Sequence, residues 1–185
     1  MIYLMRHGQD DENFIGGWSE VSLIPEGVVQ ANEVGFWIKE NLKINRILCS
    51  TVNRAIQTAD IVNKYLAVKV EYDDNLREQS KGLLNGMLKE KAEIEYSEFV
   101  NDVNEDTVYP EGESLRDLYN KMKIYISKIM EMDDGTLLIT HRGVINMIYY
   151  ILNDIPLDFD KKKFGVETAS VHELDVSKKS IRKVR

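Results

Sequence analysis

Residues 1–8, Met-Ile-Tyr-Leu-Met-Arg-His-Gly, join an apolar run of strand length to Arg6, His7 and Gly8, which we interpret as the start of a loop. A histidine attacks phosphorus when one imidazole nitrogen is unprotonated, and a neighbouring guanidinium offers a planar fork to phosphate oxygens. The glycine lets the backbone approach an anion. Because a strand-end histidine can equally be structural, a phosphate site here requires partners from the rest of the chain.

Further apolar runs of strand length follow, separated in several places by segments with helical spacing. They cover residues 46–49, 68–72, 136–140 and 170–176. This alternation is typical of an α/β layer fold with a largely parallel sheet. With 185 residues, of which 43% are hydrophobic, we expect a single domain over 1–185.

Five segments between and after these runs have recognisable patterns. Apolar residues at helical spacing predict a helix over 26–42 with Pro25 in its first turn, and a long helix follows the expected Ser114 and Asp117 capping box. The apolar stretch 144–152 predicts a short buried helix. Residues 82–109 are polar and poorly periodic, so we interpret them as a lid-like excursion, and residues 177–185 as a solvated edge strand.

Charge and cysteine content exclude several classes of protein. A formal net charge of -7 disfavours nucleic acid or an anionic membrane as the main partner. The lone Cys49 lies in an apolar strand and allows no internal disulfide, which suits a reducing compartment. No apolar stretch is long enough to cross a bilayer, and no secretory leader pattern opens the chain. We therefore expect a cytoplasmic protein.

Three further polar clusters follow predicted strands. Arg54 lies in the first turn of a helix after residues 46–49, Glu78 follows residues 68–72, and His141 directly follows residues 136–140. Ligands of parallel α/β sheets bind at the carboxyl ends of the strands. We therefore expect these three side chains to converge with Arg6 and His7.

With these motifs the chain resembles the histidine phosphatase, or phosphoglycerate mutase-like, superfamily, over nearly its whole length. Other matching positions are Asn13, Gly16, Gly17, Trp18, Leu23, Gly27, Gln30, Ala31, Pro110 to Ser114 and Thr168 to Ser170. The resemblance implies a three-layer fold, in which helices flank both faces of a mostly parallel sheet. It also implies two-step phosphoryl transfer without a metal or another cofactor.

The resemblance assigns roles to the five clustered residues. His7 would be the nucleophile that becomes a phosphohistidine, and Glu78 would protonate the leaving alkoxide. Arg6, Arg54 and His141 would hold the phosphoryl oxygens, which suits a transition state with dispersed charge. The resemblance also places Asn13, Gly17 and Trp18 at the substrate, and we add Arg142 to them. His172 lies outside the motifs and is expected to be structural.

The chain departs from the family pattern beside the predicted pocket. Asp10 stands where threonine is usual, and Arg142 where glycine is usual. We hypothesise that Arg142 either compensates Asp10 or contacts the substrate beyond its phosphate. Lys81 and Leu84 replace aromatic residues, so the pocket wall and the choice of substrate stay open.

Three functions from different classes remain. The leading one is a phosphomonoesterase that acts on a small phosphorylated metabolite. The second is a phosphoglycerate mutase-type phosphoryl transfer, and the third a catalytically weak module that binds phosphate esters. The expected partner is a small-molecule phosphate ester, and the sequence does not distinguish a monomer from a homodimer.

Overall fold

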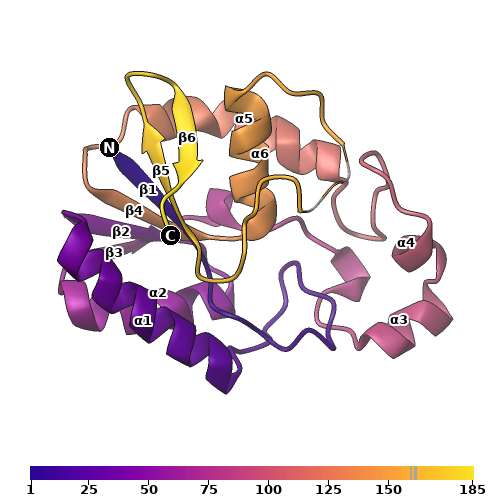
Figure 1. The fold of residues 1–185 in the computed structure, drawn as a ribbon. Coiled ribbons are helices and arrows are strands. Elements are labelled where there is room, and N and C mark those ends of the chain that lie inside the picture. The colour runs from indigo at the N-terminus through magenta and orange to yellow at the C-terminus, as the bar shows by residue number, and fades with distance from the viewer. Residues whose placement is uncertain (159, 161) are drawn as a thin grey trace.

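The computed structural model describes residues 1–158, 160 and 162–185. In this part of the chain six strands form one sheet in the order β3-β2-β4-β1-β5-β6 (Figure 1). The strands are β1 (Ile2–Arg6), β2 (Arg46–Cys49), β3 (Lys69–Tyr72), β4 (Thr136–Thr140), β5 (Val171–Asp175) and β6 (Ser180–Lys183). Neighbours from β3 to β1 pair in parallel, whereas β5 and β6 are antiparallel. The predicted mostly parallel sheet and the edge strand in the tail are confirmed.

The central strands are apolar on both faces because both faces are covered. Along β1, Ile2 and Leu4 pack in one core cluster, and Tyr3 and Met5 in another. This alternation places successive side chains on opposite faces of the sheet. The three-layer α/β class that the sequence predicts is therefore confirmed.

Helices α1 (Pro25–Asn41) and α2 (Asn53–Leu66) cover one face, and α5 (Leu115–Met130) and α6 (Arg142–Leu152) the other. Pro25 begins α1, where its missing N–H costs no helical hydrogen bond. Ser114 and Asp117 form the predicted capping box of α5. Helix α6 is almost wholly buried, as its apolar sequence indicates.

The excursion 82–109 contains more regular structure than its sequence pattern indicates. It holds a 3-10 turn (Gly82–Leu84) and two short helices, α3 (Lys89–Glu95) and α4 (Glu98–Asn101). Leu84, Ala92 and Tyr109 form a small apolar cluster of their own. In Figure 1 the segment extends beyond the sheet, on the side where the parallel strands end. No helix among the described residues is long and apolar enough to span a membrane.

Candidate active site

His7 directly follows β1 and is almost completely buried. Its Nδ1 lies 2.7 Å from the carbonyl oxygen of Gly8, which can only accept a hydrogen bond. The proton of the neutral imidazole therefore lies on Nδ1, and the lone pair lies on Nε2. Burial, and then the positive charges of Arg54 and Arg6, hold the pKa of His7 well below its usual range. The ring is thus neutral and carries an available nucleophilic nitrogen at Nε2.

Arg54 lies in the first turn of α2 and places its buried guanidinium against that nitrogen. Its Nε donates to His7 Nε2 at 3.0 Å. The other two nitrogens donate to Ser19 Oγ at 3.1 Å, to the Gly17 carbonyl oxygen at 2.9 Å and to His141 Nδ1 at 3.2 Å. These contacts fix the plane of the guanidinium, so its charge is held in place beside His7 Nε2.

His141 is the N-cap residue of α6 and is fully buried. Its Nδ1 faces Arg54, and its Nε2 lies 2.8 Å from Ser50 Oγ. Burial, and then Arg54 and His7, hold the pKa of His141 well below its usual range, so this ring is neutral as well. The two imidazole centroids are 5.1 Å apart. The structure therefore brings His141 to the expected place, where its ring packs between Arg54 and the end of β2.

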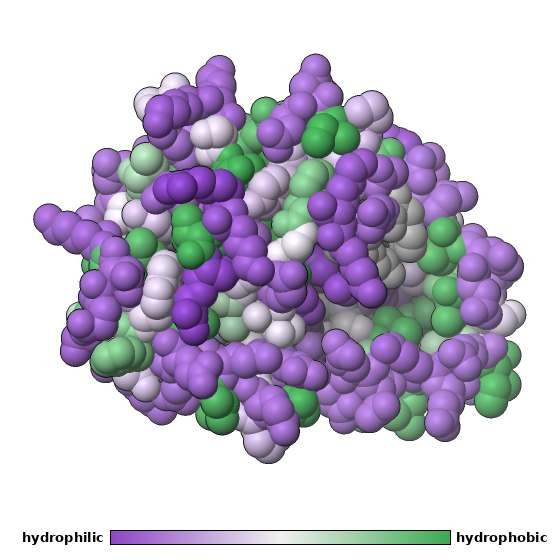
Figure 2. Space-filling view, viewed as in Figure 1, coloured by the Kyte–Doolittle hydropathy of each residue, from purple (hydrophilic) through white to green (hydrophobic). Residues whose placement is uncertain are grey.

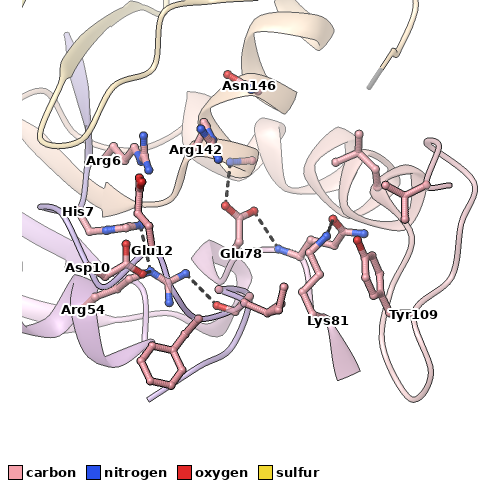
Figure 3. A pocket seen from close by; sticks show the side chains of 18 of the residues that line it. Arg6, His7, Asp10, Glu12, Arg54, Glu78, Lys81, Tyr109, Arg142 and Asn146 are labelled. Atoms are coloured by element: carbon pink, nitrogen blue, oxygen red, sulfur yellow. Dashed lines mark hydrogen bonds and ion pairs between the residues drawn. The ribbon is translucent and has the colours of Figure 1, made fainter. Parts of the chain in front are cut away.

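Arg6 ends β1 and enters the cavity beside His7 (Figure 3). One terminal nitrogen donates to the Val166 carbonyl oxygen at 3.0 Å. Its Nε is buried and has no hydrogen-bond partner among the described residues. A buried donor left without a partner costs free energy, so this nitrogen is well suited to an anion that enters the cavity.

Glu78 approaches the same cavity from the loop after β3. Its carboxylate accepts hydrogen bonds from the backbone N–H of Gly143 and of Gln79, both at 3.0 Å. The contact with Gly143 places one oxygen at the first turn of α6 (Figure 3). A Cβ at position 143 would lie 2.0 Å from Glu78 Oε1. The glycine is therefore what lets the carboxylate come this close to the helix.

Gly17 and Trp18 form a turn that contacts both Arg54 and Glu78. Gly17 has a φ of +67°, lines the cavity and accepts from Arg54 through its carbonyl oxygen. The indole N–H of Trp18 donates to the Glu78 carbonyl oxygen at 2.6 Å. Trp18 and Asn13 are exposed and lie outside the lining of the cavity. Their predicted contact with substrate stays a prediction, whereas the geometry gives Trp18 a role in holding the Glu78 loop.

The cavity has a volume of about 420 Å³ and opens between the sheet and the segment that carries α3 and α4. In the space-filling view the surrounding surface is mostly hydrophilic, and the hollow exposes apolar side chains within (Figure 2). Charged residues line its inner end, whereas apolar side chains line much of its wall. The apolar lining includes Phe14, Ile15, Phe99, Val100, Val103, Tyr109, Leu115 and Met147. The excursion 82–109 thus forms part of the wall.

Asp10 is partnered by Arg54, with 3.4 Å between its Oδ2 and Arg54 Nε. The partner of Asp10 is therefore Arg54, and not Arg142 as we hypothesised from the sequence. Arg142 lies instead at the start of α6, and its side chain points into the cavity.

Two further residues lie where the sequence places them. Cys49 is a buried strand residue, and burial raises the pKa of its thiol. His172 lies in β5 outside the cavity lining, and its ring nitrogens contact Tyr149 Oη and Ser170 Oγ, both at 2.9 Å.

Sequence reasoning missed three supporting side chains. Ser19 and Ser50 hold Arg54 and His141, and Asn85 accepts from the backbone N–H of Trp18 at 2.9 Å. Ser50 had a signal, because it is the first polar residue after β2. No comparable pattern marks the other two.

No cluster of His, Cys, Asp and Glu side chains suited to a metal ion occurs among the described residues.

Comparison with known proteins shows the family to which the chain belongs. The family model described as histidine phosphatase superfamily (branch 1) matches residues 2–185. A protein of Salmonella arizonae named probable phosphoglycerate mutase GpmB is 26% identical over 183 residues, which cover 94% of this chain and 84% of that protein.

Two solved structures share the fold. The structure of a putative alpha-ribazole-5'-P phosphatase from Escherichia coli aligns with a TM-score of 0.82 and 21% identity, covering 98% of this chain and 93% of that one. A mycobacterial glucosyl-3-phosphoglycerate phosphatase aligns with a TM-score of 0.74 and 20% identity, covering 98% and 94%. The match of the family model over almost the entire sequence shows that the chain belongs to branch 1 of the histidine phosphatase superfamily.

Proposed function

We propose that this protein is a metal-independent phosphomonoesterase that hydrolyses a small phosphorylated metabolite through a phosphohistidine on His7. The carrying observation is the hydrogen bond between His7 Nδ1 and the Gly8 carbonyl oxygen, because it directs the lone pair of Nε2 toward the cavity cations. Family membership and the names of the phosphatases that share the fold support the same activity.

In the first step, the lone pair of His7 Nε2 attacks phosphorus and the P–O ester bond breaks. Arg54 Nε exchanges its contact with Nε2 for one with a phosphoryl oxygen, and Arg6 Nε donates to another. The negative charge that accumulates on these oxygens meets guanidinium groups already in place. The leaving alkoxide takes a proton from the Glu78 carboxyl, so this mechanism requires a protonated Glu78 in the substrate complex.

In the second step, water attacks the phosphohistidine from the side that the alcohol has left. The Glu78 carboxylate accepts a proton from this water, and the bond between phosphorus and His7 Nε2 breaks. Inorganic phosphate leaves, His7 is again neutral with its proton on Nδ1, and Glu78 is again protonated. The site thus returns to its starting state without a metal or a cofactor.

A mutase is the second candidate, and the probable phosphoglycerate mutase relative favours it. A mutase must retain the phosphohistidine until a second hydroxyl accepts the phosphoryl group, which requires water to be excluded. The two functions differ in where the substrate phosphate ends, either as free phosphate or on another hydroxyl.

The test is phosphate release from p-nitrophenyl phosphate and a panel of phosphorylated metabolites, with an excess of chelator. Quenching in alkali preserves phosphohistidine, so a labelled substrate should label the protein during turnover. We expect release and labelling with the intact protein, neither with His7→Ala, and both with the surface control Arg182→Gln. Phosphorus NMR distinguishes free phosphate from a transferred phosphoryl group.

Labelled His7→Ala, or release that the chelator abolishes, would contradict the mechanism. Transfer of phosphate to another hydroxyl without release would assign the mutase. Absence of both release and labelling with every ester would favour the third function, a module that binds phosphate esters.

A further inference from the structure

Arg142 is a cation in the cavity that the two steps above do not use. It lies at the first position of α6, is half-buried and lines the cavity. Its guanidinium makes no hydrogen bond or ion pair with any residue that the structure describes. By contrast, Arg54 and Arg6 hold protein acceptors at 2.9–3.2 Å and 3.0 Å.

The charge of Arg142 acts more strongly on Arg6 than on His7. Burial and then the charge of Arg142 lower the pKa of Arg6 to about 10, with Arg142 contributing more than Arg54 does. For His7 the order is reversed, since Arg54 and Arg6 both contribute more than Arg142. Arg142 is therefore electrostatically close to Arg6 and farther from His7.

Arg142 also adjoins the general acid. The next residue, Gly143, donates its backbone N–H to Glu78 Oε2 at 3.0 Å. In Figure 3 the side chains of Arg142, Arg6 and Glu78 all face the same part of the cavity. In the proposed in-line attack the ester oxygen lies opposite His7 Nε2 and takes its proton from Glu78. The atoms bonded to that oxygen therefore lie on the Glu78 side of the cavity, which Arg142 also lines.

No carboxylate of the cavity lining forms an ion pair with Arg142 in the part of the chain that the structure describes. Asp10 pairs with Arg54 and Asp158 with Lys163, whereas Glu78 accepts two backbone N–H groups. The lining also contains Asp11, Glu12 and Asp160. Holding an unpaired guanidinium beside a second one is unfavourable, and an anionic ligand relieves that cost. A planar guanidinium fits a carboxylate or a phosphate through two parallel hydrogen bonds.

From this arrangement we propose that Arg142 binds a second anionic group, a carboxylate or a phosphate, carried by the alcohol part of the substrate close to the ester oxygen. The inference rests on the proposed function, because it takes the phosphoryl group to lie at His7. It deepens that function by naming the substrate class, which is the phosphate monoesters of acidic alcohols.

Binding of non-hydrolysable analogues tests the inference without requiring turnover. Propylphosphonate and 3-phosphonopropionate have the same chain length and differ in a terminal methyl against a carboxylate. Isothermal titration calorimetry should show that the intact protein binds 3-phosphonopropionate more tightly. In Arg142→Gln that preference should fall about 10- to 100-fold, the range expected for a hydrogen-bonded charge pair. Arg182→Gln, an exposed arginine of β6 paired with Glu173, should keep the preference.

Kinetic measurements distinguish a carboxylate from a phosphate as the second anionic group. Ethyl phosphate, phosphoglycolate and ethylene glycol bisphosphate share a two-carbon alcohol that ends in a methyl group, a carboxylate or a phosphate. The ester whose kcat/KM relative to ethyl phosphate falls most in Arg142→Gln identifies the group that Arg142 contacts. Comparing ratios between the two proteins cancels the different leaving-group abilities of the alcohols.

Three results would overturn the inference. Equal affinity of the intact protein for the two phosphonates, together with an equal effect of Arg142→Gln on kcat/KM for all three esters, would show that no second anion is recognised. An unchanged preference in Arg142→Gln would assign the recognition to another residue. An equal loss of affinity for both phosphonates would place Arg142 in the phosphoryl clamp. If no ester is turned over but the phosphonate preference depends on Arg142, the proposed hydrolysis fails while the binding inference stands.

Discussion

Replacing Gly143 by alanine should move Glu78, the proposed general acid, away from the rest of the site. The added Cβ would lie 2.0 Å from Glu78 Oε1, and contacts of this kind are essentially never shorter than 3.0 Å. The nearest obstacle is the end of a flexible side chain, so the Glu78 carboxylate moves and the backbone does not. Leu118 Cδ2, at 3.1 Å, needs to yield only slightly.

The required displacement gives the size of the effect. Relieving the contact moves Glu78 Oε1 by at least 1 Å, from 2.0 to 3.0 Å. That movement disrupts the hydrogen bond between the backbone N–H of residue 143 and Glu78 Oε2. A misplacement of about 1 Å costs a catalytic group roughly 100-fold in rate. Alanine is also a better helix former than glycine by up to about 1 kcal/mol, so the fold should not be weakened.

The assay compares a poor with a good leaving group. Ethyl phosphate needs a proton on its leaving oxygen, whereas p-nitrophenolate leaves without one. We expect kcat for ethyl phosphate to fall about 100-fold in Gly143→Ala and kcat for p-nitrophenyl phosphate to change far less. Glu78→Gln should reproduce the pattern, and thermal unfolding of Gly143→Ala should match that of the intact protein.

An equal fall in kcat for both esters would refute this reasoning, because it would mean that the substitution damages the phosphoryl site. Full activity with ethyl phosphate would refute the assignment of Glu78 as the acid at this position. A lowered unfolding temperature would show that the helix, and not the carboxylate, absorbs the contact.

Other substitutions probe the remaining contacts. Trp18→Phe removes the indole N–H bonded to the Glu78 carbonyl oxygen, so steady-state kcat for ethyl phosphate should fall about fivefold with KM unchanged, as expected for one hydrogen bond. Arg54→Lys keeps the charge but loses the planar set of donors, and single-turnover phosphorylation of His7 should slow about 100-fold. Burial lowers the pKa of His172 to about 4, so the unfolded chain binds this proton more readily than the folded chain. The free energy of unfolding should therefore fall by about 3 kcal/mol as pH drops from 6.5 to 4, and urea unfolding of His172→Gln should show a weaker pH dependence.

Outside the excursion 82–109, strand and helix positions were predictable because each has a strong local signal. The apolar run before Arg6 ends at a loop, and the capping box at Ser114 fixes the start of α5. The positions of His7, Glu78 and His141 at one edge of the sheet follow from parallel pairing, since each follows a strand of that sheet. Sequence order and a simple rule of topology therefore suffice to bring the main chemical groups together.

The supporting contacts were not predictable, because they depend on where loops cross. Asn85 lies in the excursion 82–109, yet its Oδ1 accepts from the backbone N–H groups of Trp18 and Lys81. Asp10 follows β1 closely, but only the folded geometry shows that it meets Arg54, and not Arg142. No periodicity or spacing in a single sequence carries this information.

The turn at Gly17 and Trp18 contacts both Arg54 and the Glu78 loop. Arg54, beside His7, is carried by α2, whereas Glu78 is carried by the loop after β3. The Gly17 carbonyl oxygen accepts from Arg54, and the next side chain donates to the Glu78 backbone. A side chain at position 17 would combine a φ of +67° with a Cβ only 2.3 Å from Asn85 Oδ1. The turn thus requires glycine for its shape and tryptophan for its donor, so the separation of Arg54 from Glu78, the proposed acid, depends on two residues that take no part in the proposed bond making and proton transfer.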